Sequence, residues 1–127
     1  MQSHSVTHAT SFVQAAAVQA LSGPQDFISD MVTAWDRRRH MVTNGLNTVK
    51  GIKCPLPEGA FYVFPDARET GMSSVDLGAK LLQEARVAVT PGIAFGQSGE
   101  GHFRISFATA DDLLEESVQR IGDALGW

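Results

Sequence analysis

Apolar residues recur every three or four positions in four stretches of the chain, a spacing that places them on one side of an α-helix. We expect helices over residues 11–22, 24–44, 73–85 and 109–125. Ser11 with Gln14, and Ser73 with Asp76, have the spacing of a capping box at a helix start. Pro24 suits a first helical position. The second predicted helix is the longest.

Alternation of apolar and polar residues, typical of a strand with one buried face, is clearest near the C-terminus. Phe103, Ile105 and Phe107 alternate there with Arg104 and Ser106. Shorter strand signals, separated by Pro and Gly turns, cover residues 51–54, 60–64 and 87–89. The glycine-rich stretch 95–101, just before the last strand, has the composition of a mobile loop.

These elements follow the order helix, helix, strand, strand, helix, strand, strand, helix. The order predicts an α/β (α+β) fold, in which a small mixed sheet of about four strands is covered by helices on one side. A long helix precedes the sheet. The 127 residues are enough for one such hydrophobic core.

Arg104 points away from the buried face of the last predicted strand. Two interpretations follow from its position. Most arginines on a half-exposed strand simply face solvent. Alternatively, this face looks into a cleft where the guanidinium binds an anion.

Composition and charge limit the possible partners. The net charge of −4 gives no reason to expect nucleic acid or an anionic membrane, and the basic run Arg37–Arg39 fits a solvated helix face.

Cys54 is the only cysteine, so no intrachain disulfide forms. His4 and His8 lack a carboxylate between them and make a poor metal pair. No apolar run approaches a membrane span, so we expect a cytoplasmic protein.

Familiar catalytic motifs do not occur in the sequence. The stretch "GQSGEG" lacks the context of a phosphate-binding loop, and there is no nucleophilic serine elbow. Asp111 and Asp112 suit a helix N-terminus, and Glu115 and Glu116 suit a solvent-facing helix surface. Patterns alone therefore predict a globular α/β domain without a self-contained active site.

Three segments in register resemble the C-terminal third of the class I, aspartate-aminotransferase-like enzymes of fold type I. They are "PEGAFYVFPD" (57–66), "VAVTPGIAFG" (87–96) and "HFRISFATADDLLEESVQRI" (102–121). Residues 3–21 and 37–46 are similar to further segments of that family, the latter to its long interdomain helix. The resemblance implies that residues 1–22 are the tail of a large cofactor-binding domain and residues 23–127 a small C-terminal domain that includes the linking helix.

The resemblance also implies a function. Enzymes of this family use pyridoxal phosphate to move an amino group between an amino acid and a 2-oxo acid. Arg104 matches the arginine that holds the substrate α-carboxylate. Lys50, Lys53 and Lys80 do not match the cofactor-binding lysine, so we expect no catalytic, cofactor-binding or metal-binding residue here and no activity of the isolated chain. The implied partners are the large domain and a second subunit of a homodimer.

Two other hypotheses remain open at this point. A free-standing amino-acid-binding or regulatory module could keep the fold without the chemistry, and so could a purely structural interaction domain. One residue departs from the family pattern: Arg86 stands where many relatives have glycine, and it suits a helix C-terminus as a cation.

Overall fold

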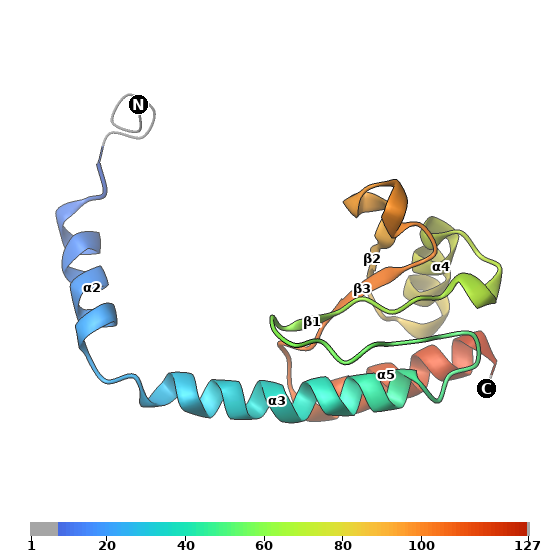
Figure 1. The fold of residues 1–127 in the computed structure, drawn as a ribbon, viewed down its shortest axis with the longest axis horizontal. Helices are drawn as coiled ribbons and strands as arrows, with labels where there is room; N and C mark the ends of the chain where they lie inside the picture. Colours follow the sequence, from blue (N-terminus) through green and yellow to red (C-terminus); the bar gives the residue numbers. More distant parts are fainter. Residues whose placement is uncertain (1–7, 127) are drawn as a thin grey trace. The chain divides into compact units, whose positions relative to one another are not determined.

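The computed structural model describes residues 8–126. The chain forms two compact units, divided between Val32 and Thr33. The first contains helix α2 (Ser11–Ser22) and the first turns of helix α3 (Asp26–Leu46). The second contains the rest of α3 and the elements that follow it (Figure 1).

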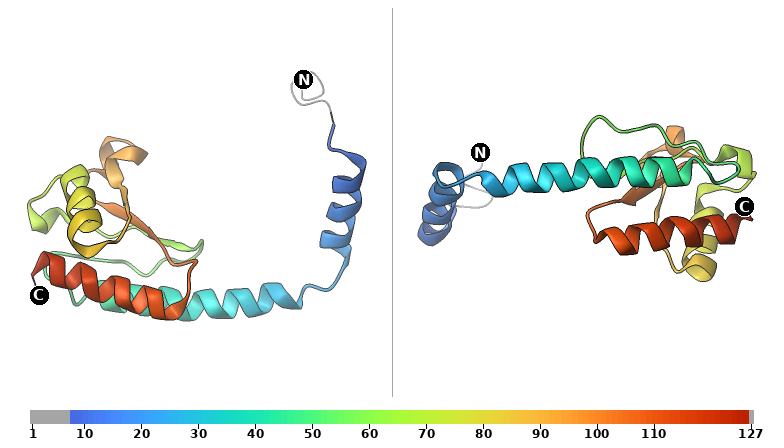
Figure 2. Two further views of the ribbon diagram at one scale, coloured as in Figure 1. Left: turned by 180° about the vertical axis from the view of Figure 1, so that it is seen from behind. Right: turned by 90° about the horizontal axis from the view of Figure 1, so that it is seen from below.

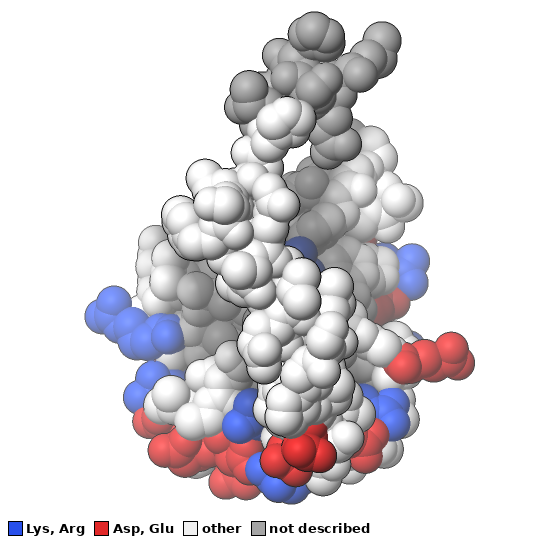
Figure 3. All heavy atoms as spheres, turned by 90° about the vertical axis from the view of Figure 1, so that its left-hand side faces the viewer, with Lys and Arg blue, Asp and Glu red and all other residues white. Residues whose placement is uncertain are grey.

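Helix α2 differs from its prediction in detail. Its N-cap is Thr10, and Gln14 donates its side-chain N–H to the Ala9 carbonyl, so the capping box predicted at Ser11 and Gln14 does not form. None of its residues is buried, with Phe12 75% and Leu21 84% exposed. The helix carries no charge, and in Figure 3 its surface is white beside the grey N-terminal residues. It therefore presents an uncharged surface with exposed apolar side chains.

Helix α3 begins two residues later than predicted. Pro24 precedes the helix instead of opening it, and Asp26 supplies the acidic side chain of the first turn. The predicted apolar stripe is buried only in the second unit, at Val42 and Leu46. Phe27 and Val32, at the other end of the stripe, are more than half exposed.

The sheet has three antiparallel strands in the order β1–β3–β2. The sequence had predicted a mixed sheet of about four strands. β3 (Phe103–Ser106) is central, between β1 (Tyr62–Val63) and β2 (Thr90–Pro91). The stretch 51–54 contributes only an isolated bridge, Lys53 with Asp66.

The strands predicted at 51–54 and 87–89 do not form, for different reasons. Pro55 and Pro57 have no N–H to donate, so a strand at 51–54 cannot extend beyond Cys54. At 87–89 the Val87 N–H donates to the Leu81 carbonyl and completes the preceding helical turn. The strand consequently starts later, at Thr90.

In the second unit, helix α4 (Ser74–Lys80), helix α5 (Asp111–Leu125) and the C-terminal half of α3 pack their buried side chains on the face of the sheet that carries Phe103 and Ile105. Helix α4 runs into a π-helical turn, η2 (Leu81–Ala85), and helix α5 lies beside the C-terminal half of α3 (Figures 1 and 2). α3 and α5 approach closely, because a side chain at Gly45 would meet Val118. The core contains Phe103 and Phe107 from the C-terminal strand region together with side chains of these helices.

Local backbone signals explain several element ends. The Asp76 N–H donates to the Ser73 hydroxyl at 3.1 Å, which confirms the predicted helix start. Arg86 ends η2 in the left-handed conformation with φ 58°. That conformation favours glycine, which has no Cβ to clash with the backbone. At the start of α5 the N-cap is Ala110, whose side chain makes no cap bond.

Candidate functional site

Arg104 lies in the middle of β3, opposite Thr90 of β2. Phe103 and Ile105 on either side of it are buried, whereas Arg104 is half-buried on the opposite face. Its guanidinium carbon lies over two aromatic rings, 4.3 Å from the centre of Tyr62 and 4.8 Å from that of Phe95. The predicted alternation along this strand is therefore confirmed, and the exposed face carries a guanidinium packed on aromatic rings.

The guanidinium of Arg104 has no carboxylate partner among residues 8–126. Most arginines in that range do: Arg37 and Arg38 pair with Asp111, Arg39 with Asp36, Arg68 with Asp66, and Arg120 with Glu116. Arg86 is also outside these ion pairs, but it is exposed at a helix end. Arg104 thus combines partial burial with an unneutralised charge.

Further aromatic side chains surround this position. Phe64 meets Phe95 edge to face at 5.7 Å between ring centres. His102 stacks on Phe64 at 5.2 Å with nearly parallel rings. An anion bound at Arg104 would therefore lie beside aromatic rings that are themselves partly exposed.

The loop that supplies Phe95 contains two short 3₁₀ helices, η3 (Gly92–Phe95) and η4 (Gln97–Gly99). Gly92 and Gly99 pack backbone against backbone: a Cβ on either would overlap the other's carbonyl oxygen. The Gly92 N–H also donates to the His102 carbonyl at 2.8 Å. The glycine-rich composition therefore allows a compact turn against the start of β3.

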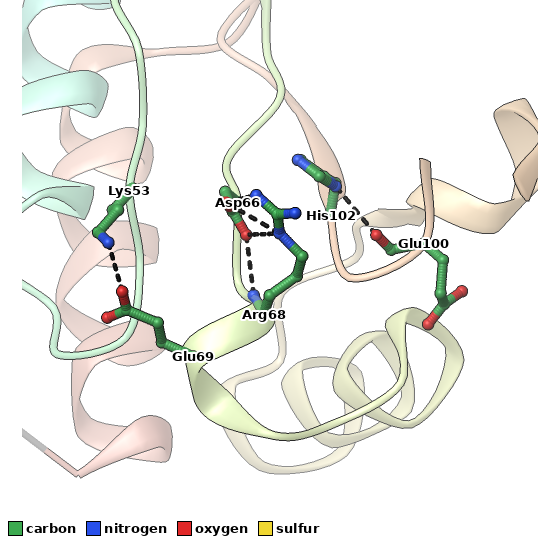
Figure 4. Close-up of polar contacts among 6 residues, drawn as sticks. All are labelled: Lys53, Asp66, Arg68, Glu69, Glu100 and His102. Carbon is green, nitrogen blue, oxygen red and sulfur yellow. Dashed lines mark hydrogen bonds and ion pairs between the residues drawn. The ribbon is translucent and has the colours of Figure 1, made fainter. Parts of the chain in front are cut away.

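Figure 4 shows two ion pairs, Asp66 with Arg68 and Lys53 with Glu69, and the contact of His102 with the Glu100 backbone. Asp66 accepts hydrogen bonds from the backbone N–H and guanidinium of Arg68, which hold the pKa of that carboxyl far below its usual range. Lys53 pairs with Glu69, and that partner raises the pKa of the lysine. His102 Nδ1 lies 3.1 Å from the Glu100 carbonyl oxygen. These interactions stabilise the fold around the site.

The three lysines lie at exposed positions or in an ion pair. Lys50 and Lys53 are exposed, and Lys80 pairs with Glu84 at 2.6 Å. A lysine that forms a Schiff base at neutral pH needs a depressed pKa, which comes from burial or a neighbouring cation. The opposite holds for Lys53, whose pKa is raised.

Two of the acidic residues considered from the sequence, Asp111 and Glu116, form ion pairs with arginines. Asp111 accepts from Arg37 and Arg38 and so joins α5 to α3, and these bonds lower its pKa. Glu116 pairs with Arg120 one helical turn away. Across residues 8–126 no group of three potential metal ligands comes together. Cys54 is buried, and burial raises the pKa of its thiol. His4 lies outside the described residues.

Two open hollows occur away from Arg104. One, of about 590 Å³, lies between α3 and α5 and is lined by Met41, Gly45, Glu115, Val118, Gln119 and Asp123. The other, of about 510 Å³, includes Arg86 and Arg120 with acidic neighbours. In the described part of the chain, no helix is long and apolar enough to cross a membrane.

Alternation in the sequence placed Arg104 on the face opposite the core, but it did not predict the aromatic neighbours of this side chain. Tyr62 and Phe64 fall in the predicted strand 60–64, where alternation could have placed both on the face of Arg104. Phe95 comes from a loop, and no periodicity places a loop residue over a strand. Its contact with Arg104 depends on the three-dimensional path of the chain.

Comparison with known proteins identifies the family of the chain. The family model "Aminotransferase class I and II" matches residues 1–121. The aspartate aminotransferase of Rhizobium meliloti is 42% identical over 134 residues, covering 98% of this chain and 32% of the relative. The aspartate/prephenate aminotransferase of Cereibacter sphaeroides is 46% identical, covering 95% of this chain and 32% of the relative.

The fold is matched among solved structures as well. The crystal structure of the aromatic aminotransferase from Pyrococcus horikoshii OT3 superposes with a TM-score of 0.92 at 43% identity, covering 98% of this chain and 33% of that chain. The chain therefore belongs to the class I and II aminotransferase family. It spans about a third of the length of the relatives it matches.

Proposed function

We propose that this chain is the small, C-terminal domain portion of a pyridoxal-phosphate-dependent aminotransferase, and that Arg104 binds the substrate α-carboxylate. Residues 23–127 form the small domain in this proposal, and residues 1–22 are the tail of the large cofactor-binding domain. The reaction is transfer of an amino group between an amino acid and a 2-oxo acid. The observation that carries the proposal is the half-buried, unpaired guanidinium of Arg104 on two aromatic rings.

The chemistry of arginine suits this role. A planar guanidinium offers two parallel N–H donors to one carboxylate and keeps its charge at every working pH. The guanidinium carbon lies over the Tyr62 and Phe95 rings, and no carboxylate among residues 8–126 pairs with this side chain. Phe103 and Ile105 hold the strand in the core, so Arg104 is presented on a rigid element.

The cofactor belongs to the remainder of the enzyme in this proposal. Pyridoxal phosphate, when bound, serves as the electron sink for amino-group transfer. None of Lys50, Lys53 and Lys80 fits the role of its anchoring lysine, because two are exposed and the third pairs with Glu84. We therefore assign this chain carboxylate binding and closure of the active site, and no catalytic step. In isolation it is inactive.

The exposed surface of α2 supports a partner domain. Phe12, Val18 and Leu21 are each more than 60% exposed on a helix without charged residues. A 12-residue helix of this kind is marginal in water unless its apolar side is covered. In the proposal the rest of the large domain, to whose tail α2 belongs, covers this surface, and the complete enzyme is a homodimer.

A hybrid enzyme tests the proposal. This chain would replace the matching third of the Rhizobium meliloti aspartate aminotransferase, and transamination would be measured for the hybrid and for its Arg104→Ala variant. We expect the hybrid to transaminate and the variant to lose most of that activity. Arg120→Ala, which removes an exposed arginine from α5, is the matched control and should keep it. A hybrid that folds and binds cofactor but is equally active with Arg104→Ala would contradict the proposal, and would favour a module without this function.

A further inference from the structure

Glu100 stands at the end of the loop that carries Phe95, and its carboxylate contacts a helix distant in sequence. One carboxylate oxygen accepts a hydrogen bond from the Ser74 backbone N–H and the other from the Ser74 hydroxyl, both at 2.7 Å. Ser74 is the first residue of α4 and is fully buried. These hydrogen bonds lower the pKa of Glu100, so its side chain is a carboxylate at neutral pH.

The Ser74 hydroxyl connects both ends of this loop. While it donates to Glu100, it accepts a hydrogen bond from the Ile93 backbone N–H at 3.3 Å. Ile93 lies in η3, two residues before Phe95. Next to these two attachment points, Gly92 and Gly99 pack against each other. The loop 92–100 is therefore tied at both ends to one buried side chain of α4.

Phe95 depends on this attachment for its position. Its side chain is 50% exposed, and its ring contacts are with Arg104 and with the edge of Phe64. A half-exposed ring at the end of a short 3₁₀ helix keeps its place only if the backbone beneath it does. The backbone in turn is held by the contacts of Glu100 and Ile93 with Ser74, together with the hydrogen bond from the Gly92 N–H to the His102 carbonyl.

We propose that Glu100 is a positioning residue for the Arg104 site. By holding the loop 92–100 on Ser74, its carboxylate keeps the Phe95 ring over the guanidinium of Arg104. The ring restricts rotation of the guanidinium, so the donors at its edge are oriented before a ligand arrives, and less entropy is lost on binding. The consequence for substrate binding rests on the proposed function, whereas the structural link does not.

The link is tested by NMR spectroscopy of the full 127-residue chain. The readout is the Nε–Hε resonance of Arg104, which senses the ring current of Phe95. Glu100→Ala should move this resonance toward its position in Phe95→Ala. In the double variant, Glu100→Ala should add no further shift, because the ring through which it acts is gone. Glu69→Ala, which removes an exposed carboxylate from Lys53, is the matched control and should leave the resonance in place.

Conservative changes separate positioning from general stability. Glu100→Gln keeps an oxygen that can accept from the Ser74 N–H. Its Arg104 resonance should therefore lie between the positions in the unchanged chain and in Glu100→Ala. Ser74→Ala removes only the bridging hydroxyl, and we expect faster hydrogen exchange at Ile93 together with the same movement of the Arg104 resonance. These two variants carry the test if Glu100→Ala does not fold. An unchanged Arg104 resonance in folded Glu100 and Ser74 variants overturns the proposal.

The kinetic consequence is measured in the hybrid enzyme. Since a cation–π contact is worth about two- to thirtyfold in affinity, Glu100→Ala should raise KM for amino acids by that factor with little change in kcat. An NMR shift without any KM effect would contradict the carboxylate-binding role of Arg104 and leave the structural link intact. A KM effect without the NMR shift would contradict the link.

Discussion

The guanidinium carbon of Arg104 lies 4.3 Å from the centre of the Tyr62 ring, and the two residues come from neighbouring antiparallel strands. Tyr62 is directly opposite Ser106, so its ring reaches Arg104 diagonally across the sheet. The contact therefore follows from strand register. A one-residue slip would turn Arg104 into the core and Ile105 outward.

Removing the Tyr62 ring should weaken the site, while removing only its hydroxyl should not. In the hybrid enzyme, Tyr62→Leu should lower kcat/KM for amino acids about two- to thirtyfold, the range of a cation–π contact. Tyr62→Phe keeps the ring face and should stay close to the parent. Equal losses in both variants would mean that the hydroxyl group matters and the ring does not.

The close packing of Gly92 against Gly99 predicts a sharp difference between glycine substitutions. Gly92→Ala places a Cβ against the Gly99 carbonyl and 2.6 Å from the His102 carbonyl oxygen, so the loop must shift. We expect a loss of about 1–3 kcal/mol in the free energy of unfolding, as for other overpacked sites. Gly59→Ala has open space around it and should be close to neutral. Urea denaturation of both variants measures the difference, and equal stabilities would contradict the packing described.

How far the sequence could predict this site is clearest on β3. One-sided burial requires alternation, so the pattern at Phe103, Ile105 and Phe107 correctly placed Arg104 on the other face. The helix start at Ser73 was predictable for a similar reason, because the capping interaction joins residues three positions apart.

The rest of the site could not be predicted from the sequence, because it is built from contacts between residues far apart in the chain. Glu100 meets Ser74 across 26 positions, and Phe95 reaches Arg104 only because the loop folds back over β3. A local window contains neither contact. The long helix was predicted from an apolar stripe, yet one end of that stripe is exposed, since a pattern shows that a side is apolar and not what covers it.

Acid should destabilise the chain through a defined set of carboxylates. The pKa values of Asp66, Glu100 and Asp111 are all lowered by hydrogen bonds made in the folded state. Their contribution to stability is therefore fully present above the unfolded-state pKa of about 4 and is lost as the pH falls below it through the lowered values. Melting temperatures should be nearly constant from about pH 7 to 5 and fall more acidic than about pH 4.

A matched variant assigns part of this acid effect. Asp66→Asn removes the carboxylate that accepts from Arg68, so the variant should be less stable at neutral pH and should lose less stability on acidification. A variant whose melting temperature falls as steeply in acid as that of the parent would exclude a contribution from Asp66.

The lysines should not capture the cofactor specifically. After incubation of the chain with pyridoxal phosphate and reduction with borohydride, mass spectrometry of peptides should find substoichiometric labelling spread over Lys50, Lys53 and Lys80. The physical reason is that Lys50 and Lys53 are exposed, Lys80 pairs with Glu84, and the Glu69 carboxylate raises the pKa of Lys53. One full equivalent of label on a single lysine would contradict the assignment of the cofactor to the rest of the enzyme.

The most direct test of the central claim compares amino acids with amines that lack the carboxylate. In the hybrid enzyme, Arg104→Ala should cost about 2–5 kcal/mol of carboxylate recognition, because a desolvated anion loses its partner. That corresponds to roughly thirty- to several-thousand-fold in kcat/KM for an amino acid, with partial recovery in Arg104→Lys. For the matching amine, kcat/KM should change little in either variant. If the amine loses as much as the amino acid, Arg104 acts only in the structure and the carboxylate assignment is wrong.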